Sequence, residues 1–370
     1  MKRSISTSVR TLRSPALCAG VILSSLALGG CWSEARDCNV EGDCFLGEVC
    51  VTGQCIFVQE TAPRVCEEDR PLECDRACVD VQTDRAHCGA CGVACAATEY
   101  CAEGECAPAA GCAVPIARAR LATQPDADLA GGEVGVEPLS TVQLDSTASF
   151  SDGGDIASQS WTLISKPKNS SARLTPNGET ATPRLNLDVA GTYVFELEVT
   201  DASGKASCQP SRVYLEATPP RGIYAEMTWS TAGDSDLSDS RGADVDLHYL
   251  HPRATWNREP WDIFWFNPQA DWGDDGDPAI LVVDDDGVGP EAVYHPDPAP
   301  LSYRVGVHYY ADNGFGPSLA SARIFFNGVN SLDLEDRELT RTGSFWFVGA
   351  IEPATGRVVI SDELLEDFPD

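Results

Sequence analysis

Basic residues, histidine and methionine are scarce in this sequence. Its 370 residues include 26 lysines and arginines, five histidines and two methionines, against 57 aspartates and glutamates. The formal net charge of −31 would repel nucleic acid and anionic membrane surfaces, so neither is an expected partner. The chain also lacks the G-x-S-x-G elbow, the P-loop and the G-x-G-x-x-G motif. These absences leave no standard catalytic or nucleotide-binding motif from which to infer an enzyme.

Long apolar runs are missing too, apart from one near the N-terminus. Residues 16–28 follow four basic residues and form an apolar run that is too short for a permanent membrane-spanning helix. We therefore interpret residues 1–30 as a cleaved signal peptide. No second run of about 20 apolar residues exists, so a lipid would be the expected membrane attachment.

The expected signal peptide ends in Leu28-Gly29-Gly30-Cys31, which resembles a bacterial lipobox. In a lipobox, a leucine and two small residues precede a cysteine that is lipidated and becomes the first residue. The resemblance implies a lipid on Cys31 and a place in the bacterial cell envelope, either periplasmic or surface-exposed. Trp32 replaces the aspartate typical of inner-membrane retention, which favours the outer membrane. The alternative is ordinary secretion, with Cys31 as one more disulfide cysteine.

The acidic excess grows when the leader is removed. The leader takes four of the 26 basic residues and none of the 57 acidic ones, which leaves a formal charge of about −35. Such a balance suits solubility in general, and it also suits divalent cations, because hard cations prefer carboxylate oxygens. Composition alone does not choose between the two.

Cysteine usage indicates an oxidising compartment. Fourteen cysteines remain after Cys18 and Cys31 are set aside, and twelve of them lie between Cys38 and Cys106. This density in an exported chain predicts disulfides. The alternative, zinc held by Cys88, Cys91 and Cys95, has suitable ligand spacing but suits an oxidising compartment less well.

Two stretches repeat the spacing C-x5-C-x2-G-x-C, at residues 44–55 and 95–106. Each has too few large apolar residues for a core, so disulfides worth about 3 kcal/mol per 15-residue loop should hold it together. Gly53 and Gly104 are expected at positive φ between bridged cysteines. We assign residues 31–63 to an anchor and a first small cysteine-rich unit.

The second copy extends backwards to Cys66 in the pattern C-x-D…D-x-x-H-C-G-x-C-G-x-x-C, which includes Asp80, Asp84 and His87. This pattern resembles the stigma-specific protein family, with His87 where asparagine is usual. The resemblance implies a stapled stalk or interaction module over residues 64–107, without known catalysis. It does not determine which cysteines pair.

Short β-favouring runs separated by turn residues predict a β-sandwich over residues 111–218. We expect Trp161 in its core and Tyr193 either on the core face or at a corner. The stretch resembles the polycystic kidney disease (PKD) type of Ig-like domain. The W-D-F-G-D-G core of that family is missing here. Cys112 and Cys208 remain after the even set of twelve, so we expect them to bridge the two ends of the domain.

A second antiparallel sandwich is predicted over residues 221–361, followed by a loose acidic tail at 362–370. This region resembles the YfaP-like family of exported bacterial proteins, which has no assigned reaction. The resemblance rests on Trp229, Asp244-Val-Asp246-Leu-His248, Pro252, Asn267-Pro268, Asp271-Trp272-Gly273, residues 284–291, residues 303–310, Asn327-Gly328 and Trp346.

Carboxylates gather at two places in the C-terminal region. Strand alternation puts Asp244, Asp246 and His248 on one face, directed outward if Val245 and Leu247 are buried. Residues 284–291 add further oxygen donors between glycines, without the spacing of an EF-hand. We predict a possible Ca²⁺ site, with an acidic turn that binds no ion as the alternative. Its candidate ligands are Asp284, Asp286, Glu291, Asp244 and Asp246.

Six aromatic residues lie between Trp256 and Trp272. Trp261, Trp265 and Trp272 are candidates for a ligand surface that stacks against sugars or quaternary amines, and packing of an irregular loop is the alternative. His248 and His251 lack the glutamate of the H-E-x-x-H zinc motif. His308 lies in an aromatic strand, where we expect a packed or an exposed polar residue rather than a catalytic one.

The sequence therefore predicts a mainly β protein in which disulfide-rich N-terminal modules precede two antiparallel β-sandwiches. We expect a lipid-anchored, surface-exposed cell-envelope protein with a binding, adhesion or structural role and no catalytic residues. Its partners would be the membrane, through Cys31, and an envelope protein or glycan. The alternative is a carbohydrate-active hydrolase or its carbohydrate-binding accessory, which would need a deep cleft and a carboxyl group of raised pKa.

Overall fold

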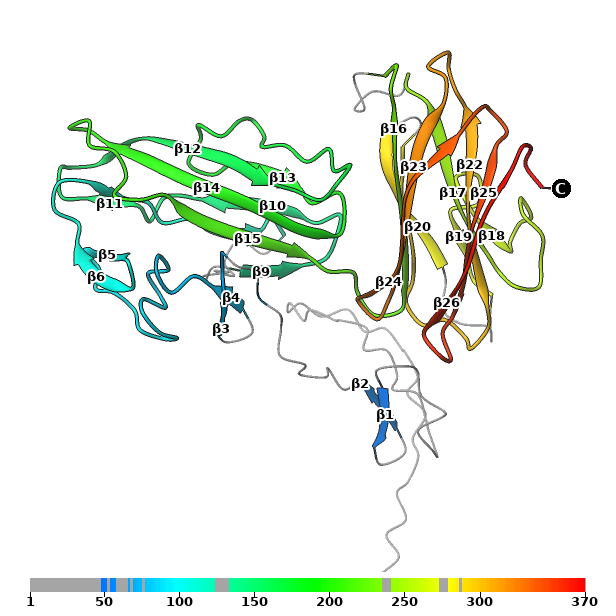
Figure 1. The fold of residues 1–370 in the computed structure, drawn as a ribbon, viewed down its shortest axis with the longest axis horizontal. Coiled ribbons are helices and arrows are strands. Elements are labelled where there is room, and N and C mark those ends of the chain that lie inside the picture. Colours follow the sequence, from blue (N-terminus) through cyan, green and yellow to red (C-terminus); the bar gives the residue numbers. More distant parts are fainter. Residues whose placement is uncertain are drawn as a thin grey trace, which may run out of the picture.

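The computed structural model describes residues 48–51, 54–57, 66, 69–74, 77–123, 133–234, 241–272, 279–285 and 288–369. All the regular secondary structure among these residues is β-strand, so the predicted mainly β fold is confirmed. Two sandwiches lie side by side, with the small hairpins of residues 72–79 and 99–108 next to the first (Figure 1). Within the described residues no helix is long and apolar enough to cross a membrane. Cys31 and the leader lie outside the described residues.

The predicted repeat takes the form of two equivalent hairpins. In one hairpin Cys50 lies opposite Cys55 in the strand register, and in the other Cys101 lies opposite Cys106 in the same antiparallel register. Gly104 has a φ of 78°, the left-handed turn expected there, whereas Gly53 lies outside the described residues. The strands of the cysteine-rich region are β1 (Glu48–Val51), β2 (Gln54–Phe57), β3 (Leu72–Cys74), β4 (Ala77–Val79), β5 (Glu99–Ala102) and β6 (Glu105–Pro108).

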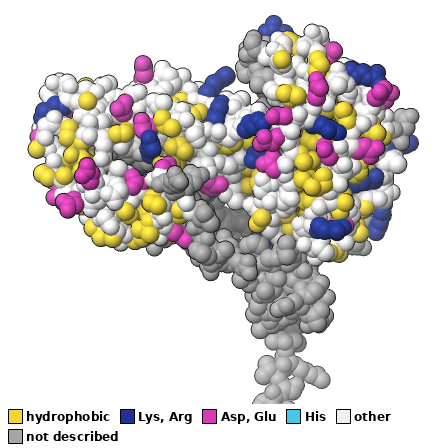
Figure 2. All heavy atoms as spheres, viewed as in Figure 1, with side chains coloured by type: hydrophobic (Ala, Val, Ile, Leu, Met, Phe, Trp, Pro, Cys, Tyr) yellow, Lys and Arg dark blue, Asp and Glu magenta, His cyan; other side chains and the backbone are white. Residues whose placement is uncertain are grey.

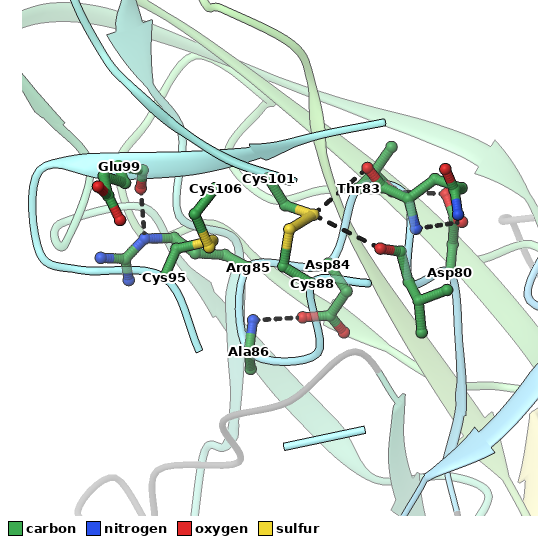
Figure 3. The surroundings of a disulfide bond; sticks show 12 residues. Asp80, Thr83, Asp84, Arg85, Ala86, Cys88, Cys95, Glu99, Cys101 and Cys106 are labelled. Atoms are coloured by element: carbon green, nitrogen blue, oxygen red, sulfur yellow. Dashed lines mark hydrogen bonds between the residues drawn. A yellow bond between two sulfur atoms is a disulfide. The ribbon is translucent and has the colours of Figure 1, made fainter. Parts of the chain in front are cut away.

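Disulfides hold the second cysteine-rich module, and their pattern interlocks. The bridges are Cys66–Cys78, Cys74–Cys91, Cys88–Cys101 and Cys95–Cys106. Because Cys88, Cys91 and Cys95 are all oxidised, none offers a thiolate to zinc. The motif carboxylates support turns: Asp80 accepts from Thr83 Oγ1 at 2.6 Å, and Asp84 accepts from the Ala86 amide at 2.7 Å (Figure 3). These aspartates therefore have structural partners.

The first sandwich contains a three-stranded sheet, β13-β10-β8, and a four-stranded sheet, β12-β14-β15-β9. One pairing differs from the expected antiparallel pattern, because β9 runs parallel to β15 at its edge. A short pair, β11-β7, closes one end. The strands are β7 (Ala113–Val114), β8 (Arg118–Leu121), β9 (Glu133–Val136), β10 (Thr141–Asp145), β11 (Phe150–Ser151), β12 (Ile156–Ser165), β13 (Arg184–Asn186), β14 (Gly191–Asp201) and β15 (Ser211–Ala217).

Alternation along β14 builds the core of the first sandwich. Tyr193, Phe195 and Leu197 are fully buried, and Trp161 packs into the same core as predicted. The Tyr193 hydroxyl lies 2.8 Å from the Val189 carbonyl oxygen and accepts from the Val189 amide at 3.0 Å. Both expectations for Tyr193 therefore hold, since it is a core residue and also ties back to the preceding corner.

The Cys112–Cys208 disulfide joins the two ends of this sandwich, with a Cα–Cα distance of 5.0 Å. It closes a span of 96 residues. In the chain-entropy model a loop near this length contributes about 4.7 kcal/mol. The first sandwich thus combines a packed core with one long-range covalent link.

The second sandwich pairs a six-stranded sheet, β19-β20-β21-β16-β23-β24, with a five-stranded sheet, β18-β17-β22-β25-β26. Its core is rich in aromatics, and Trp346, Tyr249, Tyr303 and Tyr309 are fully buried. The strands are β16 (Ile223–Thr231), β17 (Asp244–Leu250), β18 (Asp262–Ile263), β19 (Gln269–Ala270), β20 (Ala279–Asp285), β21 (Val288–His295), β22 (Tyr303–Ala311), β23 (Ser318–Phe326), β24 (Val329–Leu339), β25 (Phe345–Glu352) and β26 (Arg357–Leu365).

The prediction of a loose acidic tail is wrong for residues 361–369. Strand β26 continues through the expected boundary to Leu365, because Leu364 and Leu365 pair with Trp346 and Phe345 of β25. Asp362 also accepts a hydrogen bond from Trp346 Nε1 at 3.0 Å. Phe368 then packs against Phe345. Apolar residues interspersed among the acidic ones give this segment a place on the sandwich.

Candidate functional site

The strand β17 presents polar residues on one face and core residues on the other. Val245, Leu247 and Tyr249 point into the core. Asp246 and His248 take the opposite face, as the alternation predicted, but they are only 4% and 2% exposed. The expectation that this face points to solvent is therefore wrong, because further segments of the chain cover it.

Two such segments supply the cover, the loop that follows β17 and the C-terminal segment. Phe264 of the loop stacks on the His248 ring with centroids 5.0 Å apart, and Trp256 meets the ring edge at 6.2 Å. Phe368 lies 5.2 Å from the His248 centroid. The histidine therefore sits in an aromatic enclosure formed by residues distant in sequence.

Within this enclosure His248 has one fixed nitrogen. Its Nδ1 donates to Asp262 Oδ2 at 2.8 Å, and the Asn257 amide donates to the same oxygen at 2.7 Å. Asp262 is fully buried. Because this oxygen already accepts from the Asn257 amide, we assign the proton of the His248 contact to Nδ1. The remaining nitrogen, Nε2, is buried and has no hydrogen-bond partner.

A second histidine comes from the neighbouring strand β22. His308 is paired directly with Asp246 in the β17–β22 register. Its Nδ1 lies 3.7 Å from Asp246 Oδ2. One ligand atom each from Asp246, His248 and His308 lies within 4.8 Å of the others. Two imidazoles and one carboxylate form a donor set that suits a divalent transition metal.

The carboxylates proposed for calcium are not gathered in the same way. Glu291 is buried on β21 and accepts from the Leu247 amide at 2.6 Å, whereas Asp246 faces His308. Asp244 lies at the start of β17. Asp286 and the side chain of Asp284 lie outside the described residues, so calcium binding at this hairpin stays a prediction.

The three tryptophans predicted as a ligand surface separate into buried and exposed positions. Trp272 is 6% exposed and donates to the Pro260 carbonyl at 2.7 Å, and Trp261 packs against the core. For Trp272 the surface prediction is wrong, because its ring is buried in the core, whereas Trp261 is only partly buried. Trp265 is 44% exposed, beside Phe266 at 60% and Tyr310 at 49%. Trp265, Phe266 and Tyr310 form what we call the aromatic patch.

The aromatic patch adjoins the group formed by Asp246, His248, His308 and Asp262, which we call the Asp–His cluster. The Trp265 centroid lies 5.4 Å from Phe266 and 6.2 Å from Tyr310. Tyr310 in turn lies 6.0 Å from His308, and Phe264 connects Trp265 to His248. An apolar, flat-sided surface therefore borders a polar site, an arrangement suited to a ligand with an apolar face.

A cleft of about 440 Å³ separates the cysteine-rich module from the first sandwich. Arg70 is buried there with its guanidinium 3.7 Å from the Tyr214 ring centroid, and Tyr214 donates to Asp69 at 3.2 Å. Gln209 donates to the Cys101 carbonyl at 2.7 Å across the same boundary. Burial raises the pKa of Tyr214. These contacts fix the module against the sandwich.

The junction between the two sandwiches centres on Glu226. This buried carboxylate pairs with Arg323 and accepts from the Ala190 amide of the first sandwich at 3.1 Å. Burial raises its pKa to about 7, against the lowering effect of Arg323. Ala190 also packs with Tyr224 and Phe325 in a small apolar cluster. The junction is therefore partly buried and contains one carboxyl group of raised pKa.

Sequence reasoning missed two members of the Asp–His cluster. His308 was expected to be packed or exposed polar rather than part of a site, and Asp262 was not singled out. Their signal was weak, because His308 joins Asp246 only through the β17–β22 register and Asp262 reaches His248 only after the intervening loop folds back.

Comparison with known proteins identifies two regions. Residues 58–111 match the stigma-specific STIG1-like protein family, and residues 130–214 match the K319L-like, PKD domain. The mouse (Mus musculus) dyslexia-associated protein KIAA0319-like protein is 30% identical over 112 residues, which is 30% of this chain. The chain covers 11% of the length of that curated relative.

Two solved structures each match part of the chain. The solution structure of the PKD domain from KIAA 1837 protein is 26% identical, covers 23% of this chain and 78% of that chain, and gives a TM-score of 0.20. A nucleoside hydrolase-related hypothetical protein from Saccharophagus degradans, associated with carbohydrate metabolism, is 19% identical. The match covers 29% of this chain and 25% of that chain, with a TM-score of 0.22. The chain thus carries a STIG1-like cysteine-rich region followed by a PKD domain.

Proposed function

We propose that this chain is a lipid-anchored protein of the bacterial cell envelope, with a non-enzymatic binding, adhesion or structural role. The PKD match favours an adhesion or structural extracellular domain, and four disulfides in the cysteine-rich module suit an oxidising, surface-exposed location. The lipobox-like stretch ending at Cys31 supplies the anchor. The curated relative shares only the PKD-sized segment, so its wider activity is not carried over.

One observation carries this proposal: successive modules are joined through buried contacts. Arg70 and Tyr214 stack between the cysteine-rich module and the first sandwich, and Ala190 meets Glu226 between the two sandwiches. Such contacts resist bending more than a flexible linker would, since bending would expose the buried arginine and carboxylate. The chain is thus built to hold its C-terminal sandwich in a defined orientation.

The C-terminal sandwich then provides the surface that meets a partner. Its sequence resembles the YfaP-like exported proteins, and its aromatic patch is the part of the described chain with clustered exposed rings. On the face shown in Figure 2, acidic and basic side chains are interspersed over both sandwiches. We infer that an envelope protein or a glycan binds through stacking on Trp265, Phe266 and Tyr310.

The competing hydrolase function has one feature in its favour, a carboxyl group with a raised pKa. Glu226 has that property, but it already pairs with Arg323 and Ala190 at the junction. The adjoining cavity has a volume of about 40 Å³, enough for a water molecule or so and too small for a sugar. Junction burial accounts for the raised pKa without a catalytic role.

The anchor is tested by Cys31→Ala in the full chain, expressed with its leader in a host that lipidates exported proteins. We expect wild type to enter the detergent phase on phase partitioning and to incorporate labelled fatty acid. The variant should do neither, because the thiol is the only nucleophile for the lipid. Detergent partitioning of the variant equal to wild type would refute the lipid anchor.

The binding surface is tested by Trp265→Ala/Phe266→Ala in the mature chain, with Ile360→Ala as a matched control. Ile360 is 58% exposed on β26 of the same domain, so its loss removes exposed apolar surface outside the patch. We expect the double variant, but not the control, to lose most binding to isolated envelopes. Equal loss in both would show that the patch is not the binding surface.

A further inference from the structure

We propose that Asp246, His248 and His308 bind one divalent first-row transition-metal ion of the Zn²⁺ type on the outer face of the five-stranded sheet. This proposal concerns the C-terminal sandwich alone and does not depend on the proposed anchor or partner. It assigns a role to side chains that the binding function leaves unused.

The donor atoms are already close together. One ligand atom from each residue lies within 4.8 Å of the others, so a central ion could contact all three after small side-chain rotations. The backbone fixes this spacing. Asp246 and His248 are two residues apart on β17, hence on one face, and His308 is the register partner of Asp246 on β22.

Two buried atoms in this cluster have no hydrogen-bond partner, His248 Nε2 and Asp246 Oδ2. Their side chains are 2% and 5% exposed. A buried polar atom without a partner destabilises the folded state, and a charged one does so more. A metal ion coordinated by both atoms would remove that cost, which accounts for their presence in an otherwise aromatic enclosure.

The arrangement around His248 matches a metal-bound histidine. Its Nδ1 donates to the fully buried carboxylate of Asp262, which leaves the Nε2 lone pair available. A carboxylate behind the imidazole fixes the ring and makes Nε2 a better donor, as is common in metal sites. Asp262 is itself held by the Asn257 amide. The supporting partner is therefore as ordered as the ligand.

Charge also favours a divalent ion. Asp246 and Asp262 are both buried and each lies beside a histidine, with Arg304 acting on Asp262 at longer range. Two buried carboxylates beside one guanidinium leave a net negative charge at this site, which a divalent cation would offset. A transition ion fits better than Ca²⁺ because two of the three donors are imidazole nitrogens.

Access to the cluster lies on the side of His308, whose side chain is 16% exposed. Phe368 covers this side, with its ring 4.6 Å from His308 and 5.2 Å from His248. Three protein donors leave at least one position of a tetrahedral ion open. That position would face Phe368 and the neighbouring Tyr310, and water or a ligand group could fill it.

The test uses the mature chain with its disulfides intact, stripped of metal by a chelator and then titrated with Zn²⁺ by calorimetry and by equilibrium dialysis with elemental analysis. We expect one zinc per chain at this site. His308→Ala and Asp246→Asn should abolish that binding, and Asp262→Asn should weaken it by roughly 10–100-fold. His87→Ala, a histidine of the cysteine-rich module, should bind as wild type does.

Co²⁺ provides a readout that a merely structural role would not change. Its visible absorption should indicate nitrogen ligands in wild type and should change in His308→Ala. This variant should fold, because His308 is partly exposed, and its melting temperature without metal serves as the check. The proposal is overturned if the wild type binds no zinc, or if folded His308→Ala and Asp246→Asn retain wild-type affinity.

Discussion

The two halves of this chain reach stability by different means. All sixteen cysteines precede residue 209, whereas four of the five histidines and six of the eight tryptophans follow residue 220. The cysteine-rich module depends on interlocking disulfides and the first sandwich adds the Cys112–Cys208 bridge. The second sandwich depends on a core that contains Trp346, Tyr249 and Tyr303. Disulfides thus stabilise the part of the chain that has few large apolar residues, and core packing stabilises the part that is rich in aromatic residues.

This difference bears on function. Disulfides confine the chain without requiring a large core, so the N-terminal part can be small and stiff. A domain stabilised by packing alone has enough material to bury polar groups such as His248 and Asp262 inside an aromatic enclosure. The stapled half is therefore suited to holding position, and the packed half to building a site.

The largest expected effect comes from removing the long-range bridge with Cys112→Ala/Cys208→Ala. The first sandwich should lose up to about 4.7 kcal/mol of unfolding free energy, because its unfolded chain regains the freedom that a loop near 100 residues had lost. Native-state hydrogen exchange should show this loss in β14 and no change in β22. Equal losses in both strands would mean that the halves are not independent.

Trp346→Ala is the matching change in the other half. Trp346 is fully buried and donates to Asp362 at 3.0 Å, so its removal leaves a large cavity and should cost about 3–5 kcal/mol. Hydrogen exchange should now accelerate in β22 and β25 and remain unchanged in β14. Phe266→Ala, at a position 60% exposed, serves as the control and should change stability little.

Glu226 tests the junction between the halves through pH. Its pKa is about 7 in the folded protein and 4.5 in the unfolded reference. The folded state therefore binds more protons between these values, so stability should fall as pH rises from about 4.5 to about 7. Glu226→Gln should flatten this slope in urea unfolding curves, whereas Glu335→Gln, an exposed carboxylate at the same junction, should retain it. An unchanged slope in Glu226→Gln would assign the effect to another group.

The smallest effect should come from Lys168→Ala, which removes an exposed ion pair between the sandwiches. Lys168 lies 2.8 Å from both Glu335 and Asp336, and these side chains are each about half exposed. Solvent and salt screen such pairs. The melting temperature should barely move at physiological salt, and any shift should vanish at high salt. A large, salt-independent shift would show that this edge of the junction is more important than Glu226.

Those parts of the fold that follow local rules could be predicted from the amino-acid sequence. Alternation along β14 and β17 identified which side chains point to the core face of each strand and which to the opposite face. Tyr193 and Trp161 could be assigned to a core. The repeated cysteine spacing predicted two similar units, and both are hairpins with the same register. Elimination among the cysteines led to the Cys112–Cys208 bridge.

What covers each face of a strand depends on contacts that form only in the folded chain. Alternation sent Asp246 and His248 away from the core, but the loop carrying Phe264 and the segment carrying Phe368 turned that outer face into an enclosure. His308 reached Asp246 through strand register, a long-range property that no local pattern encodes. Burial and pairing depend on contacts between distant segments, and for that reason the candidate metal cluster emerged only once the chain was folded.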